Sequence, residues 1–349
     1  MDVVDPGVND PHFETERDTR AAMHAYACTP SGVHSMPIES AVTHFNGLHA
    51  GNPAADAPSV LWIDIVNPGP AEADFLRTRL KLHPLAVEDC MRGRQRPKLE
   101  RYPGYFFLVV YATRVNPGRN RVAFNELHTF VGERFIVTVR DHRIDEVRET
   151  LARWRATPAH FSDVGTIAHG LLDTIVDSYF KVIDHIAEQV SRVENEATSA
   201  TPEASNRHVL SVRRELILFR RVVAPVRDII GRLVRRDLPF VSPALVPYFQ
   251  DVRDHSIRIT EEIDTMRELV ASVLESQASA ASQQLNQTLR MMAAWSIILM
   301  SIAVIAGIYG MNFRFMPEMN WRYGYAFALG LMLVVGVGLV HLFRRRHWI

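Results

Sequence analysis

Two long runs without a charged side chain lie close together near the C-terminal end of this 349-residue chain. The first is Met291–Met311, between Arg290 and Asn312, and the second is Tyr323–Phe343, which only His341 interrupts. Each is about the length that a helix needs to cross the hydrocarbon core of a bilayer, roughly 20 residues. We therefore predict a transmembrane hairpin. The alternative is two buried helices of a soluble core, which rarely run so far without a charge.

The charges beside these spans predict their orientation. Three arginines follow the second span, Arg344, Arg345 and Arg346. Basic residues favour the cytoplasmic side, although Arg314 and Arg322 in the loop between the spans weaken this argument. No apolar segment near Met1 resembles a signal peptide, so we expect both termini in the cytoplasm and the spans in the inner membrane of the cell. The basic tail could be a topology anchor or a regulatory collar around a pore.

The composition excludes several classes of function. Lysine plus arginine equals aspartate plus glutamate, 39 of each, so nothing indicates a nucleic-acid partner. Only Cys28 and Cys90 are present, which makes a disulfide framework improbable and fits a reducing compartment. We find no nucleotide-binding loop and no pattern of catalytic side chains. The chain is therefore expected not to be an enzyme and to need no organic cofactor.

The remainder of the chain divides by its hydrophobic periodicity. Strand candidates at Val60–Ile65, Tyr105–Val115, Val122–Val131 and Arg134–Val139 alternate with short helical segments, and the last three are joined by short turns that predict antiparallel pairing. Weak strand signals also surround Ala41–Phe45. The predicted organisation is a mobile N-terminal extension (1–39), a cytoplasmic α/β domain (40–158), a helical hairpin (159–240), a long stalk helix that continues into the first span (241–311), an external loop (312–322), the second span (323–343) and a basic cytoplasmic tail (344–349).

The long helix has no helix breaker from Tyr248 to Gly307, roughly 60 residues or about 90 Å. Its apolar stripe alternates spacings of three and four, which predicts a coiled-coil seam between subunits: Ile259, Ile263, Met266, Val270, Val273, Gln277, Ala280 and Gln284. A face packed inside one subunit is the alternative. The stripe becomes polar toward the membrane, which favours a water-filled bore.

The end of the first span carries a short motif. Tyr309 is followed by Gly310-Met311-Asn312, and then by Met316-Pro317-Glu318. This arrangement, after the first of two C-terminal spans, resembles the signature of the CorA family of divalent-cation channels. A looser resemblance extends from about Leu61 to the C-terminus. It implies an α+β fold with a long helical stalk, a funnel-like homopentamer embedded in membrane lipid, and transport of Mg²⁺, with Co²⁺ or Ni²⁺ as further substrates.

One side of the first span is the candidate pore lining, because its residues lie three or four apart and carry no charge: Asn286, Leu289, Met292, Ser296, Met300, Ala303 and Gly307. Such a face suits a hydrophobic constriction that opens by wetting. Ordinary helix packing through small residues is the alternative.

In the resembled family the Gly310-Met311-Asn312 segment is the selectivity filter, and we expect the Asn312 amide to contact the hydrated ion, with Gly310 turning the backbone and Met311 packing. Glu318 would either concentrate cations at the mouth or be an ordinary solvated carboxylate of the loop.

Five cytoplasmic carboxylates match positions that hold regulatory Mg²⁺ in the resembled family: Glu88, Asp89, Asp173, Asp177 and Asp251. The resemblance implies that Asp89 of one subunit faces Asp251 of the next. Oxygen ligands of this kind suit hard cations. By itself, each of these acids would be read as a solvated surface charge. His255 lies four residues after Asp251, which makes a zinc or nickel site there conceivable.

Two other functions remain open. One is the zinc-transporting branch of the same superfamily, and the other is a membrane-anchored metal sensor without a conducting pore. The sequence also departs from the family pattern at Ser301, where many members have proline. The absence of proline predicts a straighter first span.

Overall fold

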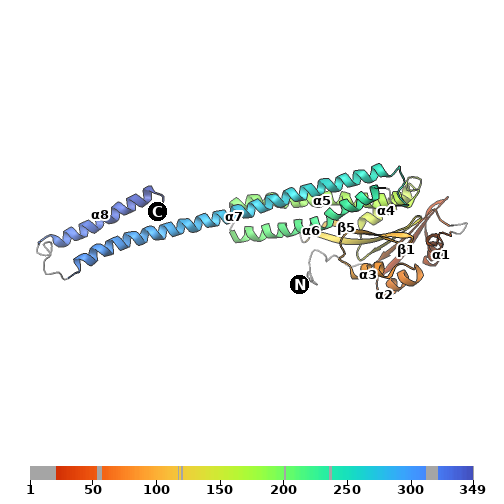
Figure 1. The fold of residues 1–349 in the computed structure, drawn as a ribbon, viewed down its shortest axis with the longest axis horizontal. Helices are drawn as coiled ribbons and strands as arrows, with labels where there is room; N and C mark the ends of the chain where they lie inside the picture. Colours follow the sequence, from red (N-terminus) through yellow and green to blue (C-terminus); the bar gives the residue numbers. More distant parts are fainter. Residues whose placement is uncertain are drawn as a thin grey trace. The chain divides into compact units, whose positions relative to one another are not determined.

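The structure, a computed structural model, describes residues 21–52, 57–116, 118, 121–199, 202–235, 238–311 and 321–348. The chain divides into two compact units, Met1–Ala271 and Ser272–Ile349. The division falls within one continuous helix, α7 (Val246–Tyr309). Figure 1 shows a sheet with its helices in the first unit and two apolar helical segments in the second.

The first unit is built on a seven-stranded mixed sheet in the order β2-β1-β3-β7-β6-β5-β4. The strands are β1 (Ala22–Thr29), β2 (Gly32–Met36), β3 (Val60–Val66), β4 (Lys98–Tyr102), β5 (Tyr105–Asn116), β6 (Arg121–Val131) and β7 (Phe135–Arg140). The β5–β6 and β6–β7 pairs are antiparallel, as their short turns predict. The parallel pair β3–β7 is not visible in the sequence.

A buried polar cluster joins the parallel strands. The Asp64 carboxylate of β3 accepts hydrogen bonds from Thr138 at 2.7 Å and from Arg140 Nη2 at 2.8 Å, both on β7. Trp62 Nε1 donates to the same Thr138 hydroxyl at 3.0 Å. A buried carboxylate needs such partners, because losing water without replacement is costly. These contacts therefore fix the register between β3 and β7.

Helices cover both faces of the sheet. The helices of the chain are α1 (Ile38–His49), α2 (Pro70–Asp74), the π-helical turn η1 (Phe75–Arg79), α3 (Pro84–Arg92), α4 (Asp145–Ala156), α5 (Val164–Ser199), α6 (Pro202–Val234), α7 and α8 (Gly324–Arg345). On one face, α1 to α3 bury Phe45, Leu61, Ile63, Phe107 and Phe130 in one apolar cluster. On the other face, Trp62 packs on Trp154 of α4 at 5.9 Å, and Tyr179 of α5 donates a hydrogen bond to the Tyr111 carbonyl at 2.7 Å.

The helices α5 and α6 form the expected hairpin, and within the first unit α7 packs beside them (Figure 1). Ile259, Ile263 and Val270 of α7 are buried within the single chain. Arg220 of α6 also contacts Asp264 of α7, with Nε and Oδ1 2.7 Å apart. This part of the apolar stripe is therefore a face packed inside one subunit, and the prediction of a seam between subunits is wrong here. A spacing of three and four is shared by both arrangements.

The N-terminal part of the sheet corrects two expectations. Strands β1 and β2 lie within the segment 1–39 that was expected to be a mobile extension, so the α/β unit begins before residue 40. Their hairpin is held because β1 pairs with β3 from Ala22 to Cys28, a tertiary effect that local propensity does not reveal. The weak strand signal at Ala41–Phe45 belongs to α1, in which Ala41, Val42 and Phe45 are buried at helical spacing. The edge strand β4 was not predicted.

Candidate ion pathway and carboxylate sites

The second unit contains the C-terminal part of α7 and the helix α8, both long and apolar enough to cross a membrane. Ala294 and Ile298 of α7 pack against Phe343 of α8, with Ile302 and Leu339 beside them. Outside this narrow contact, most side chains of both helices are exposed. Exposed apolar surface on this scale indicates contact with lipid or with other copies of the chain.

The predicted pore face is exposed along its whole length. Met292 is 60% exposed and Met300 66%, and Asn286, Leu289, Ser296, Ala303 and Gly307 are exposed as well. At 3.6 residues per turn, Met292, Ser296 and Met300 fall about half a turn from Ala294 and Ile298, which contact α8. The packing between α7 and α8 therefore leaves this face available to line a pore.

Two serines of the first span are satisfied within the helix. Ser296 Oγ donates to the Met292 carbonyl at 2.9 Å, and Ser301 Oγ donates to the Ile297 carbonyl at 2.7 Å. A hydroxyl bonded in this way costs little in an apolar environment. The pore face can thus carry Ser296 and remain hydrophobic in character.

The filter motif begins at the end of α7. The Gly310 N–H donates to the Ala306 carbonyl at 2.9 Å, and the Met311 N–H donates to the Ile308 carbonyl at 3.3 Å. A Cβ on residue 310 would lie 3.2 Å from the Ala306 carbonyl oxygen, so a close backbone approach favours glycine there. Met311 is 47% exposed. Asn312 and Glu318 lie outside the described residues.

Asp89, the first regulatory candidate, already has a partner within the chain. Its Oδ2 lies 2.7 Å from Nζ of Lys98, which also lies 2.8 Å from Oε1 of Glu100. Burial lowers the pKa of Lys98, but the hydrogen bonds to Asp89 and Glu100 outweigh it and the net direction is upward. Lys98 therefore stays charged, and any cation that binds Asp89 must compete with it. Glu88 is bonded to Arg92 at 2.7 Å on the same helix.

The segment after α3 is held by a residue that sequence reasoning missed. Glu126 of β6 accepts hydrogen bonds from the backbone N–H groups of Arg94 and Gln95, the second at 2.9 Å. Gly93 and Arg94 have φ values of 61° and 57°, so the chain turns sharply here. Glu126 thus fixes the end of α3, the helix that carries Asp89. An isolated acid within a strand gave no signal of this role.

The other three acids lie near one another on α5 and α7. His255 Nδ1 is 3.9 Å from Asp177 Oδ1. Burial, and then the negative charge of Asp173, raises the pKa of Asp177, and Asp251 contributes in the same direction. Burial lowers the pKa of His169, and the negative charge of Asp173 reduces the size of this shift. These carboxylates repel one another, and a bound cation would reduce this repulsion.

These acids do not form a complete metal site in one chain. Within the described part of the sequence, no group of three or more histidine, cysteine, aspartate or glutamate side chains has a geometry that could hold a metal ion. The structure shows no contact between Asp89 and Asp251 among its described interactions. The described ion pair of His255, which was considered with Asp251 as a zinc or nickel site, is with Asp177. The site between subunits that the resemblance implies for Asp89 and Asp251 stays a prediction.

The basic tail follows the end of α8. Arg344 and Arg345 lie in its last turn, and the Arg346 N–H caps the helix by donating to the carbonyls of Leu342 and Phe343. All three side chains are exposed. Cations at a helix C-terminus interact favourably with its dipole. This geometry is compatible with both predicted roles of the tail, a topology anchor and a regulatory collar around a pore.

Comparison with known proteins places these observations in context. The family model described as CorA-like Mg²⁺ transporter protein matches residues 58–345. YfjQ of Bacillus subtilis (strain 168), named as a candidate metal ion transporter, is 31% identical over 288 residues, which cover 82% of this chain and 89% of that protein. The cobalt/magnesium transport protein CorA of Thermotoga maritima is 27% identical over 303 residues, covering 85% and 86%. The complete structure of the CorA magnesium transporter from Methanocaldococcus jannaschii matches the fold with a TM-score of 0.76 at 18% identity, covering 94% of this chain and 98% of that one.

Proposed function

Because this chain belongs to the family of CorA-like Mg²⁺ transporter proteins, we propose that it conducts Mg²⁺ across the inner membrane through a pore enclosed by α7 helices of a homopentamer. The observation that carries this proposal is the exposed, uncharged face through Met292, Ser296 and Met300, on the side of α7 away from α8. One such face cannot enclose a pore alone. Several copies around an axis can, and their α8 helices would then face the lipid.

The ion is selected at the outer mouth by Asn312 in this proposal. Mg²⁺ is small and loses its water reluctantly, so a ring of neutral amide oxygens would accept hydrogen bonds from the hydration shell. A ring of carboxylates would hold the ion more tightly and slow its release. Glu318 raises the local cation concentration near the mouth.

The driving force is the membrane potential. A charge that crosses the membrane gains about 2.3 kcal/mol per 100 mV, so a divalent ion gains roughly twice that amount on entry. Inward flow therefore needs no coupled hydrolysis. Both termini face the cytoplasm, and the first unit meets the ion after it has crossed.

Cytoplasmic Mg²⁺ closes the pore in this proposal. An ion shared by Asp89 of one subunit and Asp251 of the next would offset their repulsion and hold the subunits together. Asp173 and Asp177 lie on the Asp251 side, where burial, and then the negative charges of Asp173 and Asp251, raise the pKa of Asp177. Lys98 competes with the ion at Asp89 because its ammonium occupies Oδ2. This competition would place closure at a higher Mg²⁺ concentration than free carboxylates would give.

The proposed function is tested with the purified protein in liposomes that contain a Mg²⁺ indicator. Influx that rises with an imposed inside-negative potential is expected, with empty liposomes as the control. Competition by Zn²⁺, Co²⁺ and Ni²⁺ then ranks the substrates. A preference for Zn²⁺ would assign the zinc-transporting branch instead, and binding of metal without any influx would assign a sensor.

Replacement of Met300 by serine tests the constriction. A polar side chain stabilises water in a narrow apolar pore, so Met300→Ser is expected to increase Mg²⁺ leak severalfold at a high Mg²⁺ concentration that closes the parent protein. Val334→Ser, at an exposed position of α8 (68%), is the matched control and should leave the leak unchanged. Equal flux in both variants and in the parent would mean that Met300 packs against helices.

A further inference from the structure

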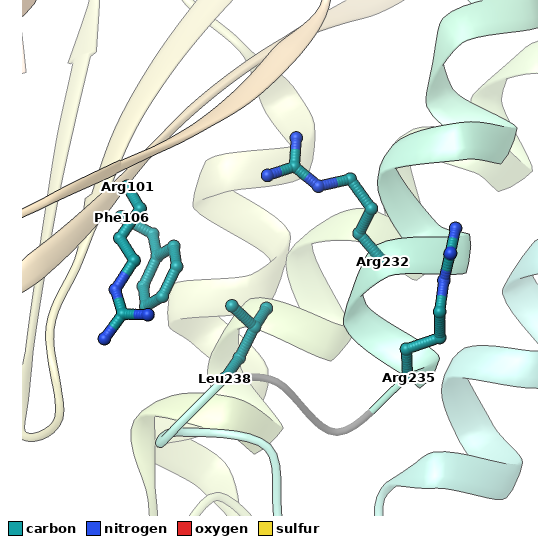
Figure 2. Close-up of a pocket in the computed structure, with 5 residues that line it drawn as sticks. All are labelled: Arg101, Phe106, Arg232, Arg235 and Leu238. Carbon is teal, nitrogen blue, oxygen red and sulfur yellow. The ribbon is translucent and has the colours of Figure 1, made fainter.

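A hollow lined by three arginines lies where the β4–β5 edge of the sheet meets the C-terminal end of α6. Its volume is about 370 Å³, and its walls are Arg101, Phe106, Arg232, Arg235 and Leu238. Figure 2 shows Arg101 and Phe106 on the sheet side of the hollow and Arg232 and Arg235 on the helix side. All three arginine side chains are exposed. This place is separate from the carboxylates and from the proposed pore residues described above.

Contacts within the protein hold each arginine at the rim. Arg232 Nη1 donates to the Leu99 carbonyl of the edge strand β4 at 2.5 Å, and among the described residues its other N–H groups have no hydrogen-bond partner. The Arg101 guanidinium lies over the Phe106 ring, 5.8 Å from its centroid. Arg235 Nε donates to the Gly231 carbonyl at 3.3 Å in the last turn of α6. Part of the ordering cost of a binding site is therefore met before a ligand arrives.

The described residues leave the charge in the hollow unbalanced. Among the described residues, none of the three arginines forms an ion pair with a carboxylate. The carbonyl end of α6 opposes an anion with about half an elementary charge, against three formal positive charges. A second hollow of about 420 Å³ shares Arg101 and Phe106 but contains Glu133. An anion is therefore expected in the first hollow and not in the second.

From this arrangement we propose that the hollow is a binding site for a phosphate-bearing polyanion, which links the β4 edge to the end of α6. The planar guanidinium fork matches phosphate oxygens, and several phosphate groups can engage several arginines at once. At about 30 Å³ for each water, the volume corresponds to roughly a dozen water molecules, which is more than one phosphate group needs. We therefore expect a ligand with two or three linked phosphate groups. Such phosphates come from soluble nucleotides or from phosphorylated lipid headgroups.

The test uses the full-length protein in detergent micelles, Mg²⁺-free buffer and inorganic triphosphate as the probe, with binding measured by calorimetry. Arg101→Gln and Arg235→Gln should each raise Kd about tenfold, as expected for losing a hydrogen bond to a charged group. Arg232→Lys should weaken binding less than Arg232→Gln because it keeps the charge. Arg213→Gln, which removes an exposed arginine elsewhere on α6, is the matched control and should bind as the parent does.

Competition then identifies the source of the phosphate. Displacement of triphosphate by ATP assigns a soluble ligand, and displacement only by micelles that contain a phosphorylated lipid assigns a headgroup. Either result supports the proposal if the same arginine variants also weaken binding of the competing ligand. The absence of triphosphate binding to the parent protein, or one Kd shared by the parent, the pocket variants and Arg213→Gln, would overturn it. Because the readout is binding without transport, the result is independent of the proposed pore.

Discussion

Asn312→Ala is expected to abolish Mg²⁺ uptake into liposomes while the protein still assembles and inserts. The physical reason is the hydration shell of the ion. Mg²⁺ releases its waters reluctantly, so entry requires oxygen atoms that accept hydrogen bonds from those waters. Alanine offers no acceptor, and every subunit of the ring loses the group at once. The loss should therefore reach the background of empty liposomes, measured with an internal Mg²⁺ indicator.

Two further variants sharpen this prediction. Asn320→Ala removes the same amide from the same loop and should transport normally, which controls for a general effect on the loop. Asn312→Asp should bind the ion more tightly and transport it more slowly, because a ring of charges retains a cation. Size-exclusion profiles check that assembly is unchanged. Normal uptake by Asn312→Ala would show that this amide is not the filter.

Asp89→Asn combined with Asp251→Asn is expected to remove closure by Mg²⁺ and the protection that Mg²⁺ gives the cytoplasmic region against protease. A ligand shifts a conformational equilibrium only through its different affinities for the two states. Moving a population from 1:99 to 99:1 needs about 5.5 kcal/mol, which several equivalent ion sites in one oligomer can supply together. The measurements are Mg²⁺ flux against internal Mg²⁺ concentration and the rate of limited proteolysis.

The contact between Lys98 and Asp89 gives this test a variant that acts in the opposite direction. Lys98→Met removes the ammonium 2.7 Å from Asp89, so closure should occur at a lower Mg²⁺ concentration. Asp254→Asn, which neutralises another exposed acid on α7, is the control and should close as the parent does. A double variant that still closes at the parent's Mg²⁺ concentration would exclude Asp89 and Asp251 as the sensor.

The membrane helices were predictable because their signal is nearly free of competing interpretations. Twenty-one consecutive residues from Met291 to Met311 without a charge satisfy the requirement for a span directly. The strands β5, β6 and β7 were predictable as well, because short turns force neighbours in sequence to become neighbours in space. In both cases the information is local.

The elements that sequence reasoning missed depend on distant partners. Strand β1 is stabilised by pairing with β3. Strand β3 itself was predicted, but its parallel pairing with β7, about 70 residues later in the chain, was not. Ile259 and Ile263 show the same difficulty in a helix, because their spacing fits a partner in another subunit as well as the observed burial inside this one. Periodicity indicates that one face of a helix is buried, but it does not indicate whether the partner lies in the same subunit or in another.

The candidate sites were predictable only in part for a similar reason. The family resemblance implied a role for Asp89 and Asp251, which stays a prediction, but the ion pair of Asp89 with Lys98 depends on how β4 lies beside α3. The bonds that Glu126 accepts from the backbone after α3 depend on the turn at Gly93 and Arg94, and no pattern in the sequence predicted this turn. The arginine-lined hollow joins residues more than 130 positions apart, as the bond from Arg232 to Leu99 shows. Such pairs become visible only when the chain has folded.

The position of the sheet in the chain has a consequence for biosynthesis. All seven strands lie between Ala22 and Arg140, and the parallel pair is complete once β7 has been made. The first membrane span begins near Met291, about 150 residues later, and ribosomes add about 5–20 residues per second. The sheet therefore has roughly 8–30 seconds to form before any span can leave the ribosome. The slow, long-range pairing of β3 with β7 can therefore be finished before the hairpin enters the bilayer.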